Sequence, residues 1–393
     1  MLSARKLIRQ PAQDVDERPF MVIWETTIAC DLVCLHCRAE AIAQQDPLRL
    51  STAEGKTLLD QIKAFGKPLP IVVLTGGDPF KREDIFELVD YGTSIGLSMA
   101  VSPSATPLLT YDNLKQLRDA GAKAISLSLD GSTADQHDTF RGVAGSFQMT
   151  LDGWRAAQEI GLKVQINTTV TRHNLYDLPA ILKHVKEQGV MTWSVFFLVP
   201  TGRGLLKDEI SPQAYEDVLN WLYDASRYIR IKTTEGHHYK RVVLQRAQID
   251  AHHDDPISIM GLGETYICLR DKLYQYAHES LLPLDAAPVR RTPMNINAGS
   301  GFMFVSRRGD VFPSGFMPLS AGNIRQETLI DIYQQSDLFQ QLRQVENLKG
   351  RCGSCEYNTV CGGSRSRAYV MTGDPNAEEP FCIYQPGSFP YQG

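Results

Sequence analysis

Short apolar runs alternate with longer amphipathic segments along most of the chain from Phe20 onward. An uninterrupted apolar run is typical of a strand buried on both faces, whereas apolar residues that recur every three to four positions indicate a helix. The predicted strands are residues 21–27, 71–75, 97–102, 124–129, 164–170 and 193–199. The predicted helices are residues 52–64, 83–95, 111–120, 146–160, 178–188 and 211–226. The pattern therefore predicts six consecutive strand–helix units.

Strand–helix units in series predict an α/β fold with parallel strands and right-handed crossovers. A closed barrel needs eight units, so six predict a partial (β/α)6 barrel of the TIM type, with its chemistry at the carboxyl ends of the strands. Four regions are expected: a leader (1–19), the barrel (20–228), an irregular bridging segment (229–298) and a smaller carboxyl-terminal domain (299–393). In the last of these we expect a hairpin within 301–313 and a helix at 329–345.

The composition changes this picture little. The chain of 393 residues is 43% hydrophobic and carries a net charge of -5, without the clustered Lys and Arg of a nucleic-acid-binding surface. No stretch reaches the roughly 18 apolar residues of a membrane-spanning helix, and residues 1–19 lack the apolar core of a secretion signal. We therefore expect a cytoplasmic protein that binds neither nucleic acid nor membrane.

The cysteines point to metal chemistry. Seven of the eight lie in two groups, one near each end of the chain. Such clustering in a large chain without an export signal favours metal binding over disulfides. The eighth, Cys268, is isolated and is expected to be a buried cysteine, with a role at the substrate or at a cluster as the alternative.

The first group is Cys30, Cys34 and Cys37, directly after the first predicted strand. Three thiolates can hold one face of an iron–sulfur cube and leave the fourth iron open to a ligand. Structural zinc needs a fourth protein ligand. His36 is poorly placed to be that ligand because it is the immediate neighbour of Cys37. The spacing therefore favours a catalytic cluster over zinc.

This CX3CX2C spacing after the first strand of a partial barrel resembles the radical S-adenosylmethionine (radical SAM) superfamily. The resemblance implies a [4Fe–4S] cluster on the three cysteines that binds S-adenosylmethionine and cleaves it to a 5′-deoxyadenosyl radical for hydrogen abstraction. It also implies that His36 lies near the adenine. The turn Gly76-Gly77-Asp78-Pro79 resembles the family's GGE-type turn, which receives the ammonium group of the cofactor. An ordinary strand-to-helix turn is the alternative.

Further polar residues match the cofactor-binding face of the family. Ser126, Ser128 and Asp130 alternate along the fourth strand and should face the barrel lumen, where the resemblance implies contacts to the cofactor ribose and carboxylate. On the fifth strand Asn167 is the expected ribose contact, between Gln165 and Thr169. Near them, His137 and Arg141 match a recurring family element. Arg141 could pair with the cofactor carboxylate, or both could be structural. The glycine-rich turn at 200–204 is the expected adenine edge.

The second group, Cys352, Cys355, Cys361 and Cys382, has enough thiolates for a closed site, and ligand count alone fits zinc or a [4Fe–4S] cluster. The surrounding sequence resembles the SPASM or twitch extension, which implies an iron–sulfur cluster. Many relatives have cysteine where this chain has Ser314, and the haem-synthesis relatives often have it at Ser364. Serine is a poor ligand for iron–sulfur clusters, so one auxiliary [4Fe–4S] cluster is expected rather than two.

The resemblance is strongest to radical enzymes of alternative haem and haem d1 synthesis, and weaker to peptide maturases. It implies a flavodoxin or ferredoxin-type electron donor and modification of a tetrapyrrole side chain such as a propionate. Candidate partners for propionate carboxylates are Arg203, His237, His238, Lys240, Arg365 and Arg367. A solvent-exposed loop at 235–241 is the alternative interpretation of that segment. Two other functions remain open: a maturase for a ribosomally made peptide or protein, and a non-catalytic iron–sulfur or zinc scaffold.

Overall fold

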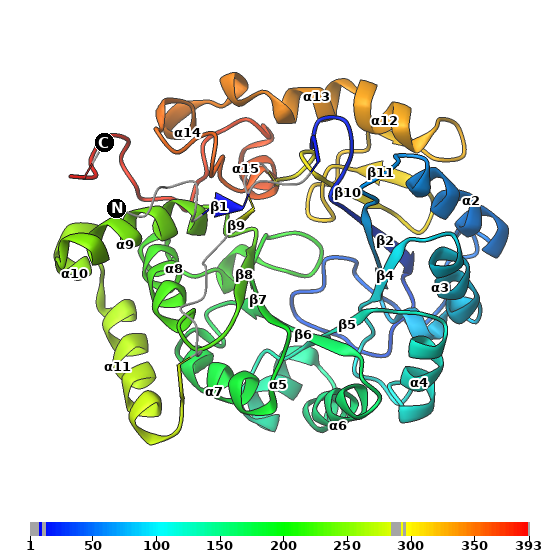
Figure 1. Cartoon of the computed structure of the whole chain (residues 1–393), viewed down its shortest axis with the longest axis horizontal. Helices are drawn as coiled ribbons and strands as arrows, with labels where there is room; N and C mark the ends of the chain where they lie inside the picture. Colours follow the sequence, from blue (N-terminus) through cyan, green and yellow to red (C-terminus); the bar gives the residue numbers. More distant parts are fainter. Residues whose placement is uncertain (1–7, 10–12, 284–291, 294–295, 392–393) are drawn as a thin grey trace.

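The computed structural model describes residues 8–9, 13–283, 292–293 and 296–391, and its centre is a ten-stranded sheet curved into a ring (Figure 1). The strand order is β12-β11-β10-β2-β3-β4-β5-β6-β7-β8, and pairing from β10 through β2 to β8 is parallel throughout. The consecutive strands of the ring are β2 (Met21–Thr27), β3 (Ile71–Gly76), β4 (Ser98–Val101), β5 (Ala124–Ser128), β6 (Lys163–Val170), β7 (Thr192–Phe197) and β8 (Ile231–Thr234). The six predicted strands are confirmed in order and position.

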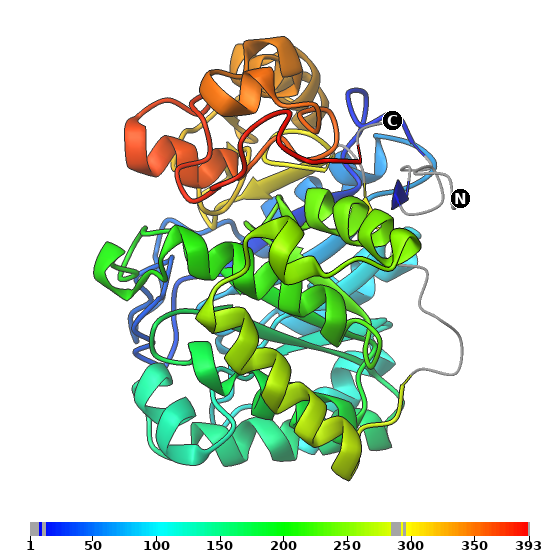
Figure 2. The same ribbon diagram turned by 90° about the vertical axis from the view of Figure 1, so that its left-hand side faces the viewer.

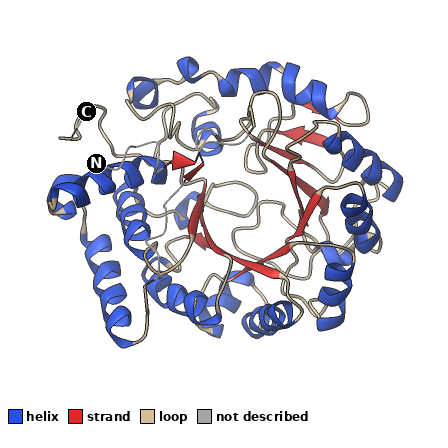
Figure 3. Ribbon diagram, in the orientation of Figure 1, coloured by secondary structure: helices blue, strands red, loops and turns tan. Residues whose placement is uncertain are grey.

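The predicted helices are also confirmed, and they form the outer layer of the ring (Figure 3). They are α2 (Thr52–Lys63), α3 (Ile85–Ser94), α4 (Tyr111–Asp119), α6 (Ser146–Glu159), α7 (Leu178–Gln188) and α8 (Pro212–Ala225). Helix α5 (Ala134–Arg141) is an extra element between β5 and α6. Ser51 forms a capping box with Glu54 at the start of α2, and Ser211 caps α8 with Pro212 in its first turn. Local capping residues therefore set these boundaries.

The two faces of each strand differ in character. On β6, Val164, Ile166, Thr168 and Val170 are buried, while the alternate residues are half-buried or exposed. The buried aliphatic residues belong to the large core between the sheet and the outer helices. Because side chains alternate across a strand, Gln165, Asn167 and Thr169 face the opposite side, the lumen of the ring. This confirms the predicted alternation that places polar residues in the lumen.

The prediction of an irregular segment at 229–298 is wrong where the structure describes it. The segment contains β8, α9 (Tyr239–His252), α10 (Pro256–Met260) and α11 (Glu264–Glu279). Helix α9 buries charged residues, including Arg241 and Arg246, in ion pairs with Glu216 and Asp224 of α8. Its buried face mixes charged residues with apolar ones such as Val242 and Ile249, which hides the helical period. Residues 284–291 and 294–295 of this segment, and 1–7 and 10–12 of the predicted leader, lie outside the described residues.

The carboxyl-terminal part adds β10 (Phe302–Val305), β11 (Asp310–Phe312) and β12 (Gly322–Asn323) to the sheet. Strands β10 and β11 form the predicted hairpin. The single helix predicted at 329–345 is wrong: it is split at Ser336, which is extended (ψ 128°), into α12 (Leu329–Gln335) and α13 (Asp337–Arg343). Helices α14 (Gly350–Ser354) and α15 (Arg365–Thr372) follow. Two short strands, β1 (Ile8–Arg9) and β9 (Thr292–Pro293), pair separately.

The carboxyl-terminal part lies on the side of the ring where β8 and β10 are not paired with each other (Figures 1 and 2). Helix α15 is central on this side, and α12, α13 and α14 lie outside it. The open side of the partial barrel is thus covered by a different part of the chain. Among the described residues, no helix is long and apolar enough to span a bilayer.

Candidate active site

The first three cysteines lie on the loop between β2 and α2, as predicted. Cys30 and Cys34 are buried in a small apolar cluster with Leu32 and Ala41, and the partly buried Cys37 packs against it. All three are free thiols. The loop therefore brings the three side chains into one sheltered cluster without a disulfide.

Each of these sulfurs has a nitrogen donor of its own. The Leu32 N–H donates to Cys30 Sγ (3.4 Å), the Ala41 N–H to Cys37 Sγ (3.5 Å) and Arg141 Nη1 to Cys34 Sγ (3.6 Å). Donors aimed at sulfur favour the thiolate form and are a feature of iron–sulfur sites. Burial still raises the pKa of the Cys30 thiol, although the Leu32 N–H acts against this rise, so a thiolate there also needs a cationic centre. The residues present thus fit a cluster held by three thiolates.

The cysteine loop is fixed by the glycine-rich turn after β7. Arg203 donates from its main-chain N–H to the Cys37 carbonyl (3.0 Å), and from its side chain to the carbonyls of Cys34 (2.9 Å) and Ala41 (3.0 Å). Gly202 approaches so closely that a Cβ there would lie 2.5 Å from the Cys37 carbonyl oxygen. Arg203 was a candidate for binding propionate, but in the structure it holds the cysteine loop.

The turn at 76–79 also packs against the cysteine loop. The Gly77 N–H donates to the Thr27 carbonyl (2.8 Å), and a Cβ on Gly77 would lie 2.4 Å from the Ala29 carbonyl oxygen, which explains the glycine. Asp78, followed by Pro79, is fully buried and accepts from Thr106 Oγ1 (2.6 Å) and the Phe80 N–H (3.2 Å). Both Asp78 oxygens are thus bound by protein groups, and a contact from Asp78 to the cofactor ammonium stays a prediction.

The lumen residues of β5 and β6 lie beside one another. Ser128 is in register with Asn167, and Ser126 with Gln165. Asp130, beyond the end of β5, accepts from the Thr169 N–H (2.7 Å) and forms an ion pair with Arg141. Arg141 therefore connects the carboxylate of Asp130 to the sulfur of Cys34. The structure brings these predicted residues together and gives Arg141 protein partners; a contact to the cofactor carboxylate remains a prediction.

His36 and His137 lie next to this ion pair. The His36 ring stacks on Phe140 with 4.4 Å between ring centroids, and Phe140 stacks in turn on His173. Burial and the nearby Arg141 lower the pKa of His36 to about 3, so its imidazole is neutral. His137 Nδ1 accepts from the Asp130 N–H (3.1 Å), which gives it the structural role that was left open.

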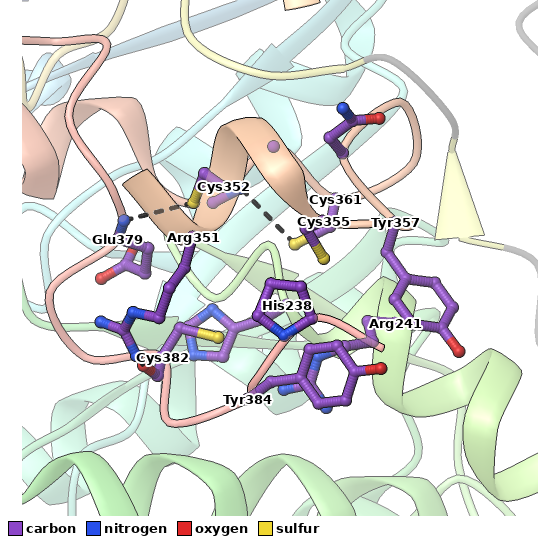
Figure 4. A pocket seen from close by; sticks show the side chains of 14 residues that line it. His238, Arg241, Arg351, Cys352, Cys355, Tyr357, Cys361, Glu379, Cys382 and Tyr384 are labelled. Carbon is purple, nitrogen blue, oxygen red and sulfur yellow. Dashed lines mark hydrogen bonds between the residues drawn. The ribbon is translucent and has the colours of Figure 1, made fainter. Parts of the chain in front are cut away.

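The second group of cysteines lines one pocket of the carboxyl-terminal part (Figure 4). Cys352 lies on α14, Cys355 directly after it, and Cys361 and Cys382 on the loops before and after α15. Among the described residues, no three His, Cys, Asp or Glu side chains converge tightly enough to hold a single metal ion. The four thiols therefore surround a common space without meeting at one point.

Donors to sulfur recur in this pocket. The Glu379 N–H donates to Cys352 Sγ (3.3 Å), the Gly363 N–H to Cys361 Sγ (3.4 Å) and Arg365 Nη2 to Cys352 Sγ (3.7 Å). Arg241 also lines the pocket. Burial raises the pKa of Cys361 to about 12 and of Cys355 to about 11. Thiolates in this pocket therefore need a cationic centre to compensate their charge. Four thiols around one pocket, with N–H donors aimed at their sulfurs, fit an iron–sulfur cluster.

Ser314 and Ser364, where the resemblance leads us to expect cysteine in relatives, converge on one carboxylate. Ser314 donates to Glu235 Oε1 (3.3 Å), Ser366 donates to the same oxygen (3.0 Å) and Ser364 donates to Oε2. Glu235 follows β8, is 5% exposed and has a φ of 57°, a conformation uncommon outside glycine. Sequence reasoning missed Glu235, because only the fold brings it to residues about 80 to 130 positions away.

Most other candidates for propionate binding are buried among protein partners. Arg367 is 0% exposed, pairs with Glu379 (3.2 Å) and donates to the carbonyls of Leu198 and Glu235. Arg365 donates to the Pro375 and Ala377 carbonyls. The prediction that these two arginines bind a substrate carboxylate is therefore wrong.

The segment from Glu235 to Arg241 is largely buried, so the alternative of a solvent-exposed loop is also wrong. Lys240 donates to the Ile296 carbonyl (3.0 Å), and His238, which lines the cysteine pocket, is 1% exposed. His237 is half-buried, and burial lowers its pKa. Cys268 was expected to be buried but is exposed on α11, a helix that carries none of the other cysteines.

Comparison with known proteins decides the family. A family model described as the Radical SAM superfamily matches residues 24–191, and one described as an iron–sulfur cluster-binding domain, SPASM, matches residues 297–356. The AdoMet-dependent heme synthase of Methanosarcina barkeri (strain Fusaro) is 39% identical over 371 residues, which span 94% of this chain and 97% of that protein. The chain belongs to the radical SAM superfamily. It is therefore an enzyme that uses a [4Fe–4S] cluster and S-adenosylmethionine. Its SPASM domain is an iron–sulfur cluster-binding domain.

Two further comparisons place this radical SAM enzyme among its relatives. The pre-heme d1 synthase of Dinoroseobacter shibae is 29% identical over 374 residues, spanning 92% of this chain and 85% of that protein. The crystal structure of Streptococcus suis SuiB bound to its precursor peptide SuiA has a TM-score of 0.65 at 17% identity, covering 94% of this chain and 76% of that one. The second comparison shows a shared fold.

Proposed function

We propose that this radical SAM enzyme modifies a propionate side chain of a tetrapyrrole in the synthesis of a haem-type cofactor. The observation that carries the proposal is the 39% identity to a heme synthase over 97% of that protein's length. The 29% identity to a pre-heme d1 synthase supports the same substrate class. The match spans 94% of this chain, so it concerns more than the barrel.

The residues that would hold the cofactors follow from the two cysteine groups. Cys30, Cys34 and Cys37 would hold the cluster that binds S-adenosylmethionine. Cys352, Cys355, Cys361 and Cys382 would hold one auxiliary [4Fe–4S] cluster. Ser314 and Ser364 support the count of one, because their hydroxyls are engaged by the buried Glu235 carboxylate. His36, Gly76, Gly77, Asp78, Pro79, Ser126, Ser128, Asp130, Arg141 and Asn167 remain the proposed surroundings of S-adenosylmethionine.

When bound, the first cluster and S-adenosylmethionine would supply a 5′-deoxyadenosyl radical, the reagent that hydrogen abstraction from the substrate would require. Loss of a propionate carboxyl as carbon dioxide would then leave a vinyl group and one electron. The electron needs an acceptor, and an auxiliary iron–sulfur cluster is of the right chemical class. The hydrogen atom ends in 5′-deoxyadenosine, so atoms and electrons balance.

The protein's own contribution is positioning and exclusion of water. Arg203 and Gly202 fix the cysteine loop against the end of β7. Arg141 holds its charge next to Cys34 through a buried ion pair with Asp130. The carboxyl-terminal part covers the open side of the ring. These contacts keep the place of radical formation rigid and sheltered, which such chemistry requires.

Several properties belong to the proposal as well. A flavodoxin or ferredoxin-type protein would donate the electron that starts each turnover. The enzyme would work in the cytoplasm without a nucleic-acid or membrane partner. A peptide substrate is the principal alternative, and the test below separates the two.

The test is anaerobic reconstitution followed by incubation with dithionite, S-adenosylmethionine and iron-coproporphyrin. We expect 5′-deoxyadenosine formation that rises with the porphyrin, together with loss of carboxyl mass from it by mass spectrometry. Cleavage of S-adenosylmethionine that does not respond to the porphyrin would contradict the tetrapyrrole assignment and favour a peptide substrate. Failure to cleave S-adenosylmethionine with the first cluster intact would support a scaffold.

A further inference from the structure

A row of polar side chains crosses the lumen of the ring from β5 to β8. Ser128 on β5 is in register with Asn167 on β6, Asn167 with Ser194 on β7, and Ser194 with Lys232 on β8. Residues in register on neighbouring parallel strands face the same side of the sheet. The row therefore faces the lumen, opposite the buried Trp193 and Val195 of the outer core. Three of its four members are small and polar, and the fourth is a lysine.

Lys232 is half-buried and has no hydrogen-bond or ion-pair partner in the part of the chain that the structure describes. The carboxylates elsewhere in the lumen are already engaged. Glu25 is bound by Arg38 (2.7 Å) and Arg307 (2.9 Å), and Asp130 is bound by Arg141. Burial alone lowers the pKa of Lys232 to about 8, without a contribution from any charged neighbour. The ammonium group therefore has no internal counter-charge.

Ser194, the neighbour of Lys232 in the row, also has a polar group without a partner among the described residues. Ser194 is 0% exposed, and its buried hydroxyl has no hydrogen-bond partner in the described part of the chain. A buried polar group without a partner is unfavourable, and a charge that is partly withdrawn from water without a counter-charge is unfavourable as well. Two such groups side by side are unfavourable for folding alone, and a ligand that accepts hydrogen bonds from both would compensate. Such a ligand is anionic.

The position of the row suggests what the anion belongs to. Neighbouring strands lie about 4.8 Å apart, so Lys232 is about 14 Å across the sheet from Ser128 and about 10 Å from Asn167. Ser128 and Asn167 are the proposed neighbours of S-adenosylmethionine. An anion at Lys232 would lie in the same lumen, on the far side from the three cysteines along the strand order. This separation suits a group of the substrate better than a group of the cofactor.

We propose that Lys232, with Ser194 beside it, binds a carboxylate of the substrate inside the barrel. The inference rests on the proposed function, because a tetrapyrrole with several propionates supplies such carboxylates. Lys232 is thus a substrate-positioning residue, which selects for acidic side chains and orients the ring for hydrogen abstraction. S-adenosylmethionine also carries a carboxylate, so the experiment has to distinguish the two sources.

The experiment is equilibrium dialysis of the reconstituted holoenzyme with iron-coproporphyrin III and with its tetra-amide, in which every carboxylate is a neutral carboxamide. The wild-type enzyme should prefer the acid. K232M should bind the acid about 10–100-fold more weakly, since a hydrogen bond to a charged group is lost, and should bind the amide unchanged. K232R should retain most of the preference. The matched control is K183M, because Lys183 lies on the outer helix α7 in an exposed pair with Glu187.

Other outcomes would overturn the inference. An unchanged preference for the acid in K232M would show that the carboxylate binds elsewhere. A loss of S-adenosylmethionine affinity in K232M with unchanged porphyrin affinity would assign the carboxylate to the cofactor. If the wild-type enzyme binds neither porphyrin, the proposed function fails and this inference with it. That result differs from a failure of Lys232 alone, in which the wild-type enzyme still binds.

Stability gives a second measurement that does not depend on the ligand. Removal of a half-buried charge that has no partner among the described residues should leave the folded protein as stable as before or more stable. K232M is therefore expected to unfold at the wild-type temperature or above it. Marked destabilisation of K232M would mean that Lys232 serves the fold and would contradict a role in binding.

Discussion

The two cysteine groups differ in how the fold presents their sulfurs. Cys30, Cys34 and Cys37 come from one short loop after β2, in a cluster next to the lumen. The four carboxyl-terminal cysteines come from α14 and two loops and enclose a pocket outside the lumen. The first group offers three thiols and the second four. A cubic cluster has four irons, so a cluster held by the first group would keep one iron without a cysteine ligand, and one held by the second group would keep none.

Their electrostatic surroundings differ as well. At the first group Arg141 reaches Cys34 Sγ and is balanced by Asp130, and Arg203 holds the Cys34 carbonyl. At the second group Arg241 and Arg351 line the pocket, where they pair with Glu216 and Glu378. Arg365 reaches Cys352 Sγ there. The second group therefore has more arginine–carboxylate pairs around it than the first.

The largest expected effect is the loss of the first cluster in C34A. Changes to residues that merely orient a metal ligand cost about 10–100-fold, so removal of a ligand should lower 5′-deoxyadenosine formation by more than about 100-fold. Far-ultraviolet circular dichroism should remain close to that of the wild type. C268A is the matched control, because Cys268 is exposed on α11. Undiminished cleavage of S-adenosylmethionine by C34A would contradict the assignment of the catalytic cluster to Cys30, Cys34 and Cys37.

Loss of the second group should have a different result. C355A should lower the iron content from about eight to about four per chain, since each cubic cluster holds about four. Cleavage of S-adenosylmethionine without substrate should continue, while turnover of the substrate should fall steeply. Iron analysis and product assays on the same sample measure both. A wild-type iron content near twelve would instead indicate a third cluster and contradict the assignment of Ser314 and Ser364.

The connection between the two regions can be tested at Arg367. This buried arginine pairs with Glu379 near the second group and bonds the Leu198 carbonyl at the end of β7. R367M would leave buried carboxylates without their cation and should lower the free energy of unfolding by about 3–5 kcal/mol. Denaturant unfolding of R367M beside K183M measures the difference. Equal free energies of unfolding for R367M and K183M would show that contacts other than those of Arg367 hold the carboxyl-terminal part against the end of β7.

A smaller effect is expected from the pH dependence at Glu209. Burial raises the pKa of this carboxyl from 4.5 to about 7. Between these values the folded protein keeps a proton that the unfolded chain releases, so stability falls as the pH rises from about 4.5 to 7. E209Q should reduce this fall by about 1–3 kcal/mol.

Unfolding at several pH values, with E187Q on the surface of α7 as the control, measures the change. A pH profile of E209Q that coincides with the wild-type profile would show that Glu209 is ionised in both states.

Much of the fold could be predicted because its signals are local. The six strands and their helices begin and end within about two residues of the predicted positions, helped by caps such as Ser51 and Ser211. Strand β8 was missed because Ile231–Thr234 has one aliphatic residue and a lysine, so it lacks an apolar run. Helix α9 was missed because its buried face is charged.

The candidate sites show the same limit. The cysteines could be predicted from their spacing, and the polar lumen from alternation along the strands. The partners of Ser314 and Ser364 could not, because Glu235 joins them only through the packing of α15 and the hairpin against the end of β8. The arginines at 365 and 367 were misassigned for a related reason. Arginine in a sequence does not reveal whether its counter-charge is a ligand or a buried carboxylate.

The way the ring closes has a consequence for what it can enclose. An eight-stranded barrel closed by main-chain hydrogen bonds has a diameter fixed by its strand number and stagger, and its interior is just filled by side chains. Here β8 and β10 are not paired, and Glu235 after β8 accepts from Ser314, which follows β11, and from Ser364 at the start of α15. No main-chain ladder between these two strands therefore fixes the width of the ring on this side. We expect substitutions of these three side chains to change the width of the lumen there without altering a strand.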